Sequence, residues 1–143
     1  MICKATLSDL STLVQLEQAC FSAPWTEQML KSSLNNPLFT AFIVKEGDTP
    51  VGYASLTTLF EEGELDKICV LPNRRKNGYA TALLTEAIGY AAGCGVTRFF
   101  LEVRTSNTPA QRLYEKFGFC RIAVRKKYYE NGEDAVVYQK TLR

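Results

Sequence analysis

The residues with the clearest chemical potential lie between an apolar strand pattern and a strongly periodic helix pattern. In the helix pattern, apolar residues recur at spacings of three and four from Ala80 to Ala91. A helix that begins here offers unpaired backbone N–H groups and the positive end of its dipole. Gly78 would let that backbone approach an anion closely. The segment predicts either a phosphate site or a basic loop that only caps the helix; its residues are Arg75, Lys76, Asn77, Gly78, Tyr79, Ala80 and Thr81.

The surrounding sequence limits the chemistry that this loop could serve. It contains no GxxxxGK[ST] motif, so a Walker-type loop is excluded, and no GxGxxG follows the first strand, so a Rossmann loop is excluded too. The chain has no histidine, which removes the commonest general base and the commonest metal ligand. Proton transfer must therefore fall to Glu, Asp, Tyr, Lys or Cys, and we expect no metal.

Periodicity and turn residues predict the elements that position this loop. Their order is β-α-α-β-β-β-α-β-α-β-β, which indicates an α+β fold with a mixed sheet and helices on both faces. At 143 residues we expect one domain spanning 1–143. The expected strands are 2–7, 39–45, 51–59, 64–71, 97–104, 119–127 and 135–141, with turns at 46–48, 61–63 and 130–132.

The sequence also predicts where the helices begin. Thr6 or Ser8 can cap the first helix. Thr26 can cap the second, which ends before residue 35, with Trp25 and Leu30 forming a hydrophobic staple across that cap. The third helix runs through 80–91 and stops at the glycines at 93 and 95. For the helix that ends at Gly118, we expect Thr108 as the cap, Pro109 at the first helical position and Gln111 as the capping-box partner.

The loop Arg-x-x-Gly-x-Ala between a strand and a long amphipathic helix resembles the pyrophosphate loop of the GCN5-related N-acetyltransferases. The resemblance extends over nearly the whole chain, through Leu101-Glu102-Val103-Arg104, Ser106-Asn107 and the segment 113–119. It implies that fold, with a splayed central strand pair in a mostly antiparallel sheet, and acetyl-CoA as co-substrate. It also implies cofactor contacts from the loop residues above and from Ile68, Cys69, Val70 and Asn107.

Several motifs are narrower than the superfamily. Pro24-Trp25-Thr26, the LEVR-x-SN block, and Lys127-Tyr128-Tyr129 leading to Glu133-Asp134-Ala135 resemble the RimI-type enzymes. Those enzymes acetylate the N-terminal alanine of small-subunit ribosomal protein 18. The resemblance implies the same activity and a peptide N-terminus as partner. The alternatives are transfer to a lysine, a polyamine or another small amine, and a non-catalytic acetyl-CoA-binding subunit.

Two residues are the candidates for proton transfer. Glu102 lies on the strand face opposite Phe99, Leu101 and Val103, and the resemblance makes it the general base; otherwise it is an exposed carboxylate paired with Arg104. The resemblance makes Tyr114 the general acid that faces the thioester sulfur. The alternative, from its place beside a helical apolar stripe, is an aromatic residue at the edge of the core.

Other residues allow weaker hypotheses. A backbone N–H of the splayed strand, at Val70, would polarise the thioester carbonyl. An acetyl-cysteine at Cys69 would need an activated thiolate, and no histidine exists to activate it. Trp25, Tyr128 and Tyr129 could line a peptide groove or belong to the core. An acidic group could face a basic acceptor peptide or be a solvated strand edge; it comprises Glu61, Glu62, Glu64 and Asp66.

Composition bounds the partners and the compartment. The net charge of +2 is too small to indicate nucleic acid or an anionic membrane as the main partner, and no apolar run approaches membrane-spanning length. The five cysteines include no CxxC pair and no secretory signal precedes them, which is typical of reduced thiols. We therefore expect a cytoplasmic protein.

Overall fold

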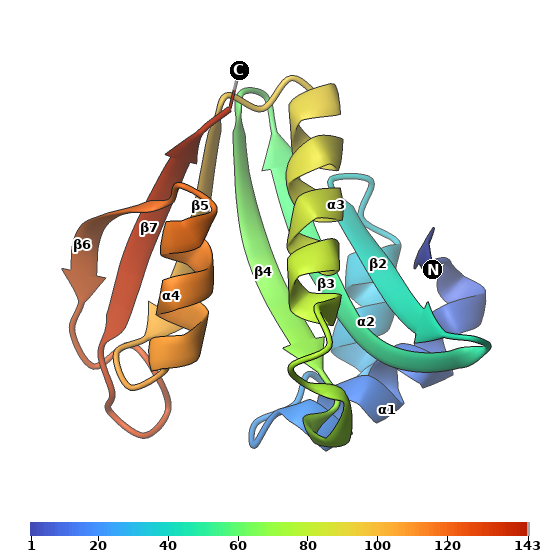
Figure 1. Ribbon diagram of the computed structural model, residues 1–143. Helices are drawn as coiled ribbons and strands as arrows, with labels where there is room; N and C mark the ends of the chain where they lie inside the picture. Colours follow the sequence, from blue (N-terminus) through green and yellow to red (C-terminus); the bar gives the residue numbers. More distant parts are fainter. Residues whose placement is uncertain (143) are drawn as a thin grey trace.

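The computed structural model describes residues 1–142 and shows a seven-stranded sheet with helices on both faces (Figure 1). The strands run in the order β1-β2-β3-β4-β5-β7-β6; β4 and β5 are parallel, and the other neighbours are antiparallel. The predicted order of helices and strands is confirmed. The strands are β1 (Ile2–Lys4), β2 (Phe39–Glu46), β3 (Thr49–Leu59), β4 (Glu62–Val70), β5 (Arg98–Arg104), β6 (Cys120–Arg125) and β7 (Ala135–Thr141).

The helices divide the buried residues into two clusters, one on each face of the sheet. Buried residues of α3 and α4 pack against one face, and those of α1 and α2 pack against the other. The larger cluster contains Leu83, Leu84 and Ala87 of the predicted stripe. The helices are α1 (Leu10–Cys20), α2 (Glu27–Leu34), α3 (Tyr79–Gly93) and α4 (Thr108–Lys116), with short 3₁₀ helices η1 (Leu7–Asp9) and η2 (Pro72–Arg74).

The parallel pair β4 and β5 separates after a short contact. Only Glu62, Gly63 and Glu64 of β4 are paired with β5. Opposite β3, the register shifts so that Ser55 pairs with Lys67 while Leu56 pairs with Leu65, which leaves Asp66 as a bulge. A bulge bends its strand, and from this point β4 and β5 diverge (Figure 1). The expected splayed strand pair is confirmed, and it opens the sheet toward the N-terminus of α3.

The alternation of buried and half-buried residues along β5 was predicted correctly, and it decides which face of the sheet carries Glu102. Phe99, Leu101 and Val103 are buried, while Glu102 and Arg104 are half-buried on the other face. That face lies on the side of α1 and α2, which cover the earlier strands of the sheet. Glu102 can therefore reach solvent from the middle of the sheet.

Several local predictions need correction. The strand expected at 2–7 ends at Lys4, because η1 begins at Leu7. The N-cap of α1 is Asp9, while Thr6 caps η1.

The turn expected at 61–63 lies one to two residues earlier, because Glu62 already pairs with Leu59 and with Arg98. The cap of α4 is Asn107, not Thr108: the Asn107 side-chain oxygen accepts from Ala110 N–H at 3.3 Å.

These shifts have local causes. With Asn107 as the cap, Pro109 falls at the second helical position, and it still costs the helix no hydrogen bond. The Gln111 side chain donates to the carbonyls of Arg104 and Thr105, both at 3.0 Å, and so ties α4 to the end of β5 instead of forming a capping box. The Thr26 cap of α2 is confirmed, because its hydroxyl accepts from Met29 N–H at 3.1 Å.

Candidate active site

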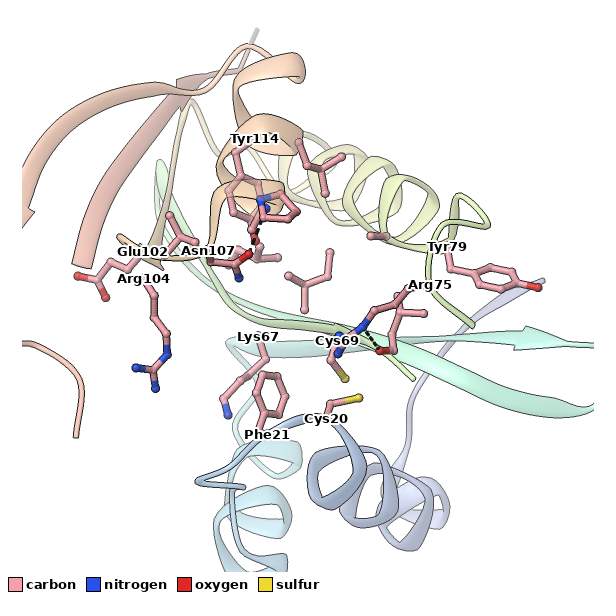
Figure 2. Close-up of a pocket in the computed structure, with 18 of the residues that line it drawn as sticks. Cys20, Phe21, Lys67, Cys69, Arg75, Tyr79, Glu102, Arg104, Asn107 and Tyr114 are labelled. Atoms are coloured by element: carbon pink, nitrogen blue, oxygen red, sulfur yellow. Dashed lines mark hydrogen bonds between the residues drawn. The ribbon is translucent and has the colours of Figure 1, made fainter. Parts of the chain in front are cut away.

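A cleft of about 840 Å³ occupies the gap where β4 and β5 separate. Its walls come from β4, β5, the loop before α3, the first turns of α4, and the segment that follows α1 (Figure 2). The structure brings the predicted site residues together here, with the exception of Asn77. Those that line the cleft are Ile68, Cys69, Val70, Arg75, Lys76, Gly78, Tyr79, Ala80, Thr81, Glu102, Asn107 and Tyr114.

The loop before α3 has the geometry of an anion site. Gly78 is the N-cap, with a φ of 82° that favours glycine. The first hydrogen bond of the helix runs from Ala82 N–H to the Gly78 carbonyl at 3.0 Å. The N–H groups of Tyr79, Ala80 and Thr81 precede that bond, so they are free of the helical ladder at the positive end of the dipole. This arrangement can bind a phosphate through the main chain.

Asn77 is the one predicted site residue that does not line the cleft within the described residues, and its side chain bonds inside the loop. Its side-chain amide donates to the carbonyls of Arg74 and Arg75, at 2.9 and 3.3 Å. It thereby braces the loop from inside, away from the cleft. The side-chain nitrogen of Asn77 is thus engaged within the loop, and its contact with the cofactor stays a prediction.

Glu46, at the end of β2, is a supporting residue that the sequence did not reveal. It accepts from Arg74 Nε at 2.9 Å and from the Tyr79 hydroxyl at 2.7 Å. The hydrogen bond from Tyr79, followed by that from Arg74, holds the pKa of Glu46 below its usual range. The Tyr79 phenol therefore points away from the cleft (Figure 2), and Tyr79 can meet a ligand through its backbone.

The main chain of β4 faces the gap at Val70. Leu71 N–H bonds to the Val51 carbonyl on β3 at 2.8 Å, and in an antiparallel pair the neighbouring residue turns its own polar groups the other way. The Val70 carbonyl accordingly accepts from Nε of Arg75, in the loop that follows β4, at 3.1 Å. Arg75 and Val70, both predicted to contact the cofactor, are thus bonded to each other.

Cys69 is not a candidate nucleophile. Its side chain is buried in the cluster under α1, beside Leu13 and Leu16. A hydrogen bond with Cys20 and burial raise the pKa of Cys69 well above its ordinary value. Nucleophilic attack requires the thiolate, and this thiol is held in its protonated form. Cys69 thus lacks both a histidine to activate it and an environment that favours the thiolate.

Glu102 lies at the end of the cleft farther from the phosphate loop (Figure 2). Its side chain is 13% exposed and forms an ion pair with Arg125 of β6. Hydrogen bonding to Glu102 is the main cause that raises the pKa of Tyr128. Burial, and then the charge of Glu102, raise the pKa of Tyr129 to about 12. The carboxylate therefore sits among protonated phenols.

The alternative pairing of Glu102 with Arg104 is wrong. Arg104 bonds instead to Glu130 at 2.8 Å and Glu133 at 3.4 Å, and its guanidinium lies 4.1 Å from the centre of the Tyr129 ring. These contacts fix the segment between β6 and β7 over the end of β5. Arg104 thereby holds Tyr129 against the cleft and leaves Glu102 to other partners.

Tyr114 is both a core residue and a cleft residue. It is 4% exposed, and its ring contacts Phe119 and Tyr138 with centroid distances of 5.9 and 6.2 Å. It nevertheless lines the cleft from α4. Burial, with a smaller effect of Tyr129, raises the pKa of Tyr114 above its ordinary value. The phenol is held protonated, as a general acid must be.

The residues of the predicted acidic group do not all lie together. Glu62 and Glu64, with Glu102 and Arg125, line a second hollow of about 320 Å³. It lies on the face of β5 that carries Glu102. Burial, then the charges of Asp66 and Glu102, raise the pKa of Glu64. Of the four acidic residues, only Glu62 and Glu64 line this hollow.

The three aromatic residues predicted to line a peptide groove or the core, Trp25, Tyr128 and Tyr129, lie in different places. Trp25 packs on the cluster between α1 and α2, 6.4 Å from the Phe39 ring. Tyr129 lines the main cleft, and Tyr128 is edge-on to it at 5.1 Å. Of the three, Tyr129 is therefore placed to meet an acceptor.

Comparison with known proteins decides the family. Residues 10–119 match the Acetyltransferase (GNAT) family. The chain belongs to this family. Its sequence is 38% identical over 123 residues to the [ribosomal protein bS18]-alanine N-acetyltransferase of Haemophilus ducreyi, covering 85% of this chain and 83% of that protein. It is 30% identical over 133 residues to the Escherichia coli enzyme of the same name, covering 91% and 89%.

The fold agrees with that assignment. The crystal structure of the ribosomal-protein-S18-alanine N-acetyltransferase from Escherichia coli superposes with a TM-score of 0.89 at 29% identity, covering 99% of this chain and 94% of that one. The family of acetyltransferases binds acetyl-CoA. Within residues 1–142, no helix is both long and apolar enough to span a membrane, and no group of three or more metal-binding side chains is found.

Proposed function

We propose that this chain transfers the acetyl group of acetyl-CoA to the N-terminal alanine of the small-subunit ribosomal protein bS18, in the cytoplasm. The observation that carries the proposal is one continuous cleft with a main-chain anion site at one end and a carboxylate at the other. Relatives that cover most of the chain carry this activity in their names. A peptide N-terminus is accordingly the proposed partner, with no nucleic acid or membrane involved.

The residues present fit acetyl-CoA. The N–H groups of Tyr79, Ala80 and Thr81 would hold the diphosphate, with Arg75 and Lys76 adding positive charge. The peptide group of Ile68 and the N–H of Val70 face the gap, while the Val70 carbonyl is bonded to Arg75. The Ile68 peptide group would pair with an amide of the pantetheine arm. When bound, acetyl-CoA supplies the activated acetyl group. The backbone of Val70 would polarise its carbonyl.

Glu102 is the proposed general base. An α-amino group has a pKa of about 8 and a lysine side chain about 10.4, so at pH 7.4 roughly 20% of the first but only about 0.1% of the second is neutral. With an N-terminal acceptor the base therefore has a smaller fraction of the amine to deprotonate than with a lysine. Glu102 would accept the amine proton directly or through one water, and its ion pair with Arg125 shows that a cationic group can reach the carboxylate.

Tyr114 is the proposed general acid. Its phenol lines the cleft from α4, opposite the β4 backbone, and would donate its proton to the sulfur that leaves. The Asn107 oxygen is engaged as the α4 cap, so Asn107 would contact the cofactor through its amide nitrogen. Glu62 and Glu64 favour an acceptor whose residues after the alanine are basic.

The test is transfer by the purified chain to three acceptors. These are a peptide with the N-terminal sequence of bS18, the same peptide with its N-terminus blocked and an internal lysine free, and a polyamine. We expect release of free CoA with the first peptide alone, and a mass gain on its alanine. Equal rates on all three would refute the N-terminal specificity, and binding of acetyl-CoA without release of thiol on any acceptor would indicate a non-catalytic subunit.

A further inference from the structure

Glu17 of α1 is a buried carboxylate that the proposed chemistry does not use. None of its surface is exposed. It accepts hydrogen bonds from the backbone N–H of Trp25 at 2.7 Å and from the Tyr53 phenol, and it pairs with the Lys67 ammonium at 3.2 Å. A carboxylate is tolerated in a core only when it is paired and hydrogen-bonded in this way. These three partners fix the position of the Glu17 carboxylate, and the carboxylate in turn fixes theirs.

Lys67 connects Glu17 to the cleft. It lies on β4, directly after the Asp66 bulge, with 16% of its side chain exposed. Its ammonium is 4.0 Å from the centre of the Phe21 ring and 4.7 Å from that of the Trp25 ring. A cation over an aromatic face is attracted to it, more strongly where water is excluded. Lys67 therefore holds the rings of Phe21 and Trp25 to the strand that forms the cleft floor.

The segment 21–25 between α1 and α2 is held at both of its ends by the same residue. Phe21 N–H bonds to the Glu17 carbonyl at 3.0 Å, and Trp25 N–H bonds to the Glu17 carboxylate. Between these points, Phe21, Ser22 and Ala23 line the cleft. Figure 2 shows Phe21 and Lys67 together on the side of the cleft that faces Arg104, away from Tyr79. The segment is thus a wall of the acceptor end.

We infer that Glu17 and Lys67 are positioning residues that fix the wall 21–25 for the acceptor. The inference rests on the proposed function, because it assigns the Glu102 end of the cleft to the acceptor. Glu17 is fully buried, so it acts through Lys67 and Phe21 and not by contact with a substrate. None of the hydrogen bonds and ring contacts of this pair involves the phosphate loop, so we expect the substitutions to leave binding of acetyl-CoA unchanged.

Two substitutions test the inference. Glu17→Gln keeps the shape and an oxygen for Trp25 N–H but removes the charge that pairs with Lys67. Lys67→Met keeps the aliphatic stem and removes the cation. We expect each to lower kcat/KM for the bS18 peptide by about 10- to 100-fold, through a higher peptide KM, as small misplacements of a substrate do. The KM for acetyl-CoA stays at the wild-type value, and Lys67→Arg restores the peptide KM.

Lys4→Met is the matched control, because Lys4 also lies over an aromatic ring, 5.2 Å from the centre of Tyr90, but does not line the cleft. It should leave both KM values unchanged. An unchanged peptide KM in Lys67→Met overturns the inference, even if Glu17→Gln does not fold. A higher peptide KM in Lys67→Met with a folded, unaffected Glu17→Gln also overturns it, in favour of direct contact. If the wild-type chain does not acetylate the peptide, the proposed function fails instead.

Discussion

Substitution of Gly78 by valine separates the phosphate loop from the rest of the fold. Gly78 has a φ of 82°, and an added Cβ would meet no atom within 4 Å. The change therefore creates no clash, but it places an L residue in a left-handed conformation, at a cost of at least about 1–2 kcal/mol. For a chain of this size that corresponds to a fall in Tm of roughly 3–8 °C, which a domain of ordinary stability survives.

The effect on affinity is larger and can be bounded. If the strained loop relaxes, the N–H groups of Tyr79, Ala80 and Thr81 no longer all point toward one phosphate position. Loss of one hydrogen bond to a charged group costs about 1.5–3 kcal/mol, which is a rise in the Kd for CoA of about 10- to 150-fold. Titration calorimetry with CoA measures this change, and thermal unfolding measures the stability.

Gly95→Val is the control at the other end of the same helix. Gly95 has a φ of 91° and likewise has no atom within 4 Å of an added Cβ, but it does not line the cleft. Both variants should lose similar stability, and only Gly78→Val should lose affinity for CoA. If Gly78→Val binds CoA as the wild type does, the loop is not the phosphate site and the reasoning fails.

Three further predictions concern single side chains. Glu102→Gln should lower turnover by about 10²–10⁴-fold with the Kd for CoA unchanged, as measured by thiol release and calorimetry; a near-wild-type rate would mean that the base lies elsewhere. Tyr114→Phe should reduce turnover while thermal unfolding stays close to wild type, because the ring contacts with Phe119 and Tyr138 remain; an undiminished rate would exclude it as the acid. Hydrogen bonds from Ser106, chiefly, and then from Arg104 and Thr105, lower the pKa of Glu133 from 4.5 to about 2. The stability that Glu133 contributes is present above pH 4.5 and lost as the pH falls toward 2, so the Tm gap between wild type and Glu133→Gln should close over that range, and a constant gap would contradict this.

The features predicted from sequence are those set by neighbouring residues. The stripe from Ala80 to Ala91, the glycine before it and the alternation along β5 each follow from a local pattern, and the structure has them as expected. The cleft residues on β4 and α4 came from a family resemblance that covers these motifs. The positions of Glu102 and Tyr114 on opposite sides of one cleft agree with that resemblance.

The features that were missed depend on contacts that no single motif contains, and some of these contacts join distant segments. Asn107 and Thr108 can both cap a helix, and the Gln111 bonds to the end of β5 accompany the choice of Asn107. The Glu46 brace of the loop joins residues 28 positions apart, and no motif surrounds it. The same holds for the ion pair of Glu102 with Arg125, which depends on how β6 and β7 return beside β5.

The central claim is that this cleft delivers an acetyl group to the N-terminal alanine of bS18 with Glu102 as the base. The most direct measurement is the intact mass of bS18 from cells that lack the chain, and from the same cells given back either the wild type or Glu102→Gln. We predict that bS18 loses its N-terminal acetyl group, that the wild type restores it fully, and that Glu102→Gln restores little of it. Acetylated bS18 in the absence of the chain would contradict the account.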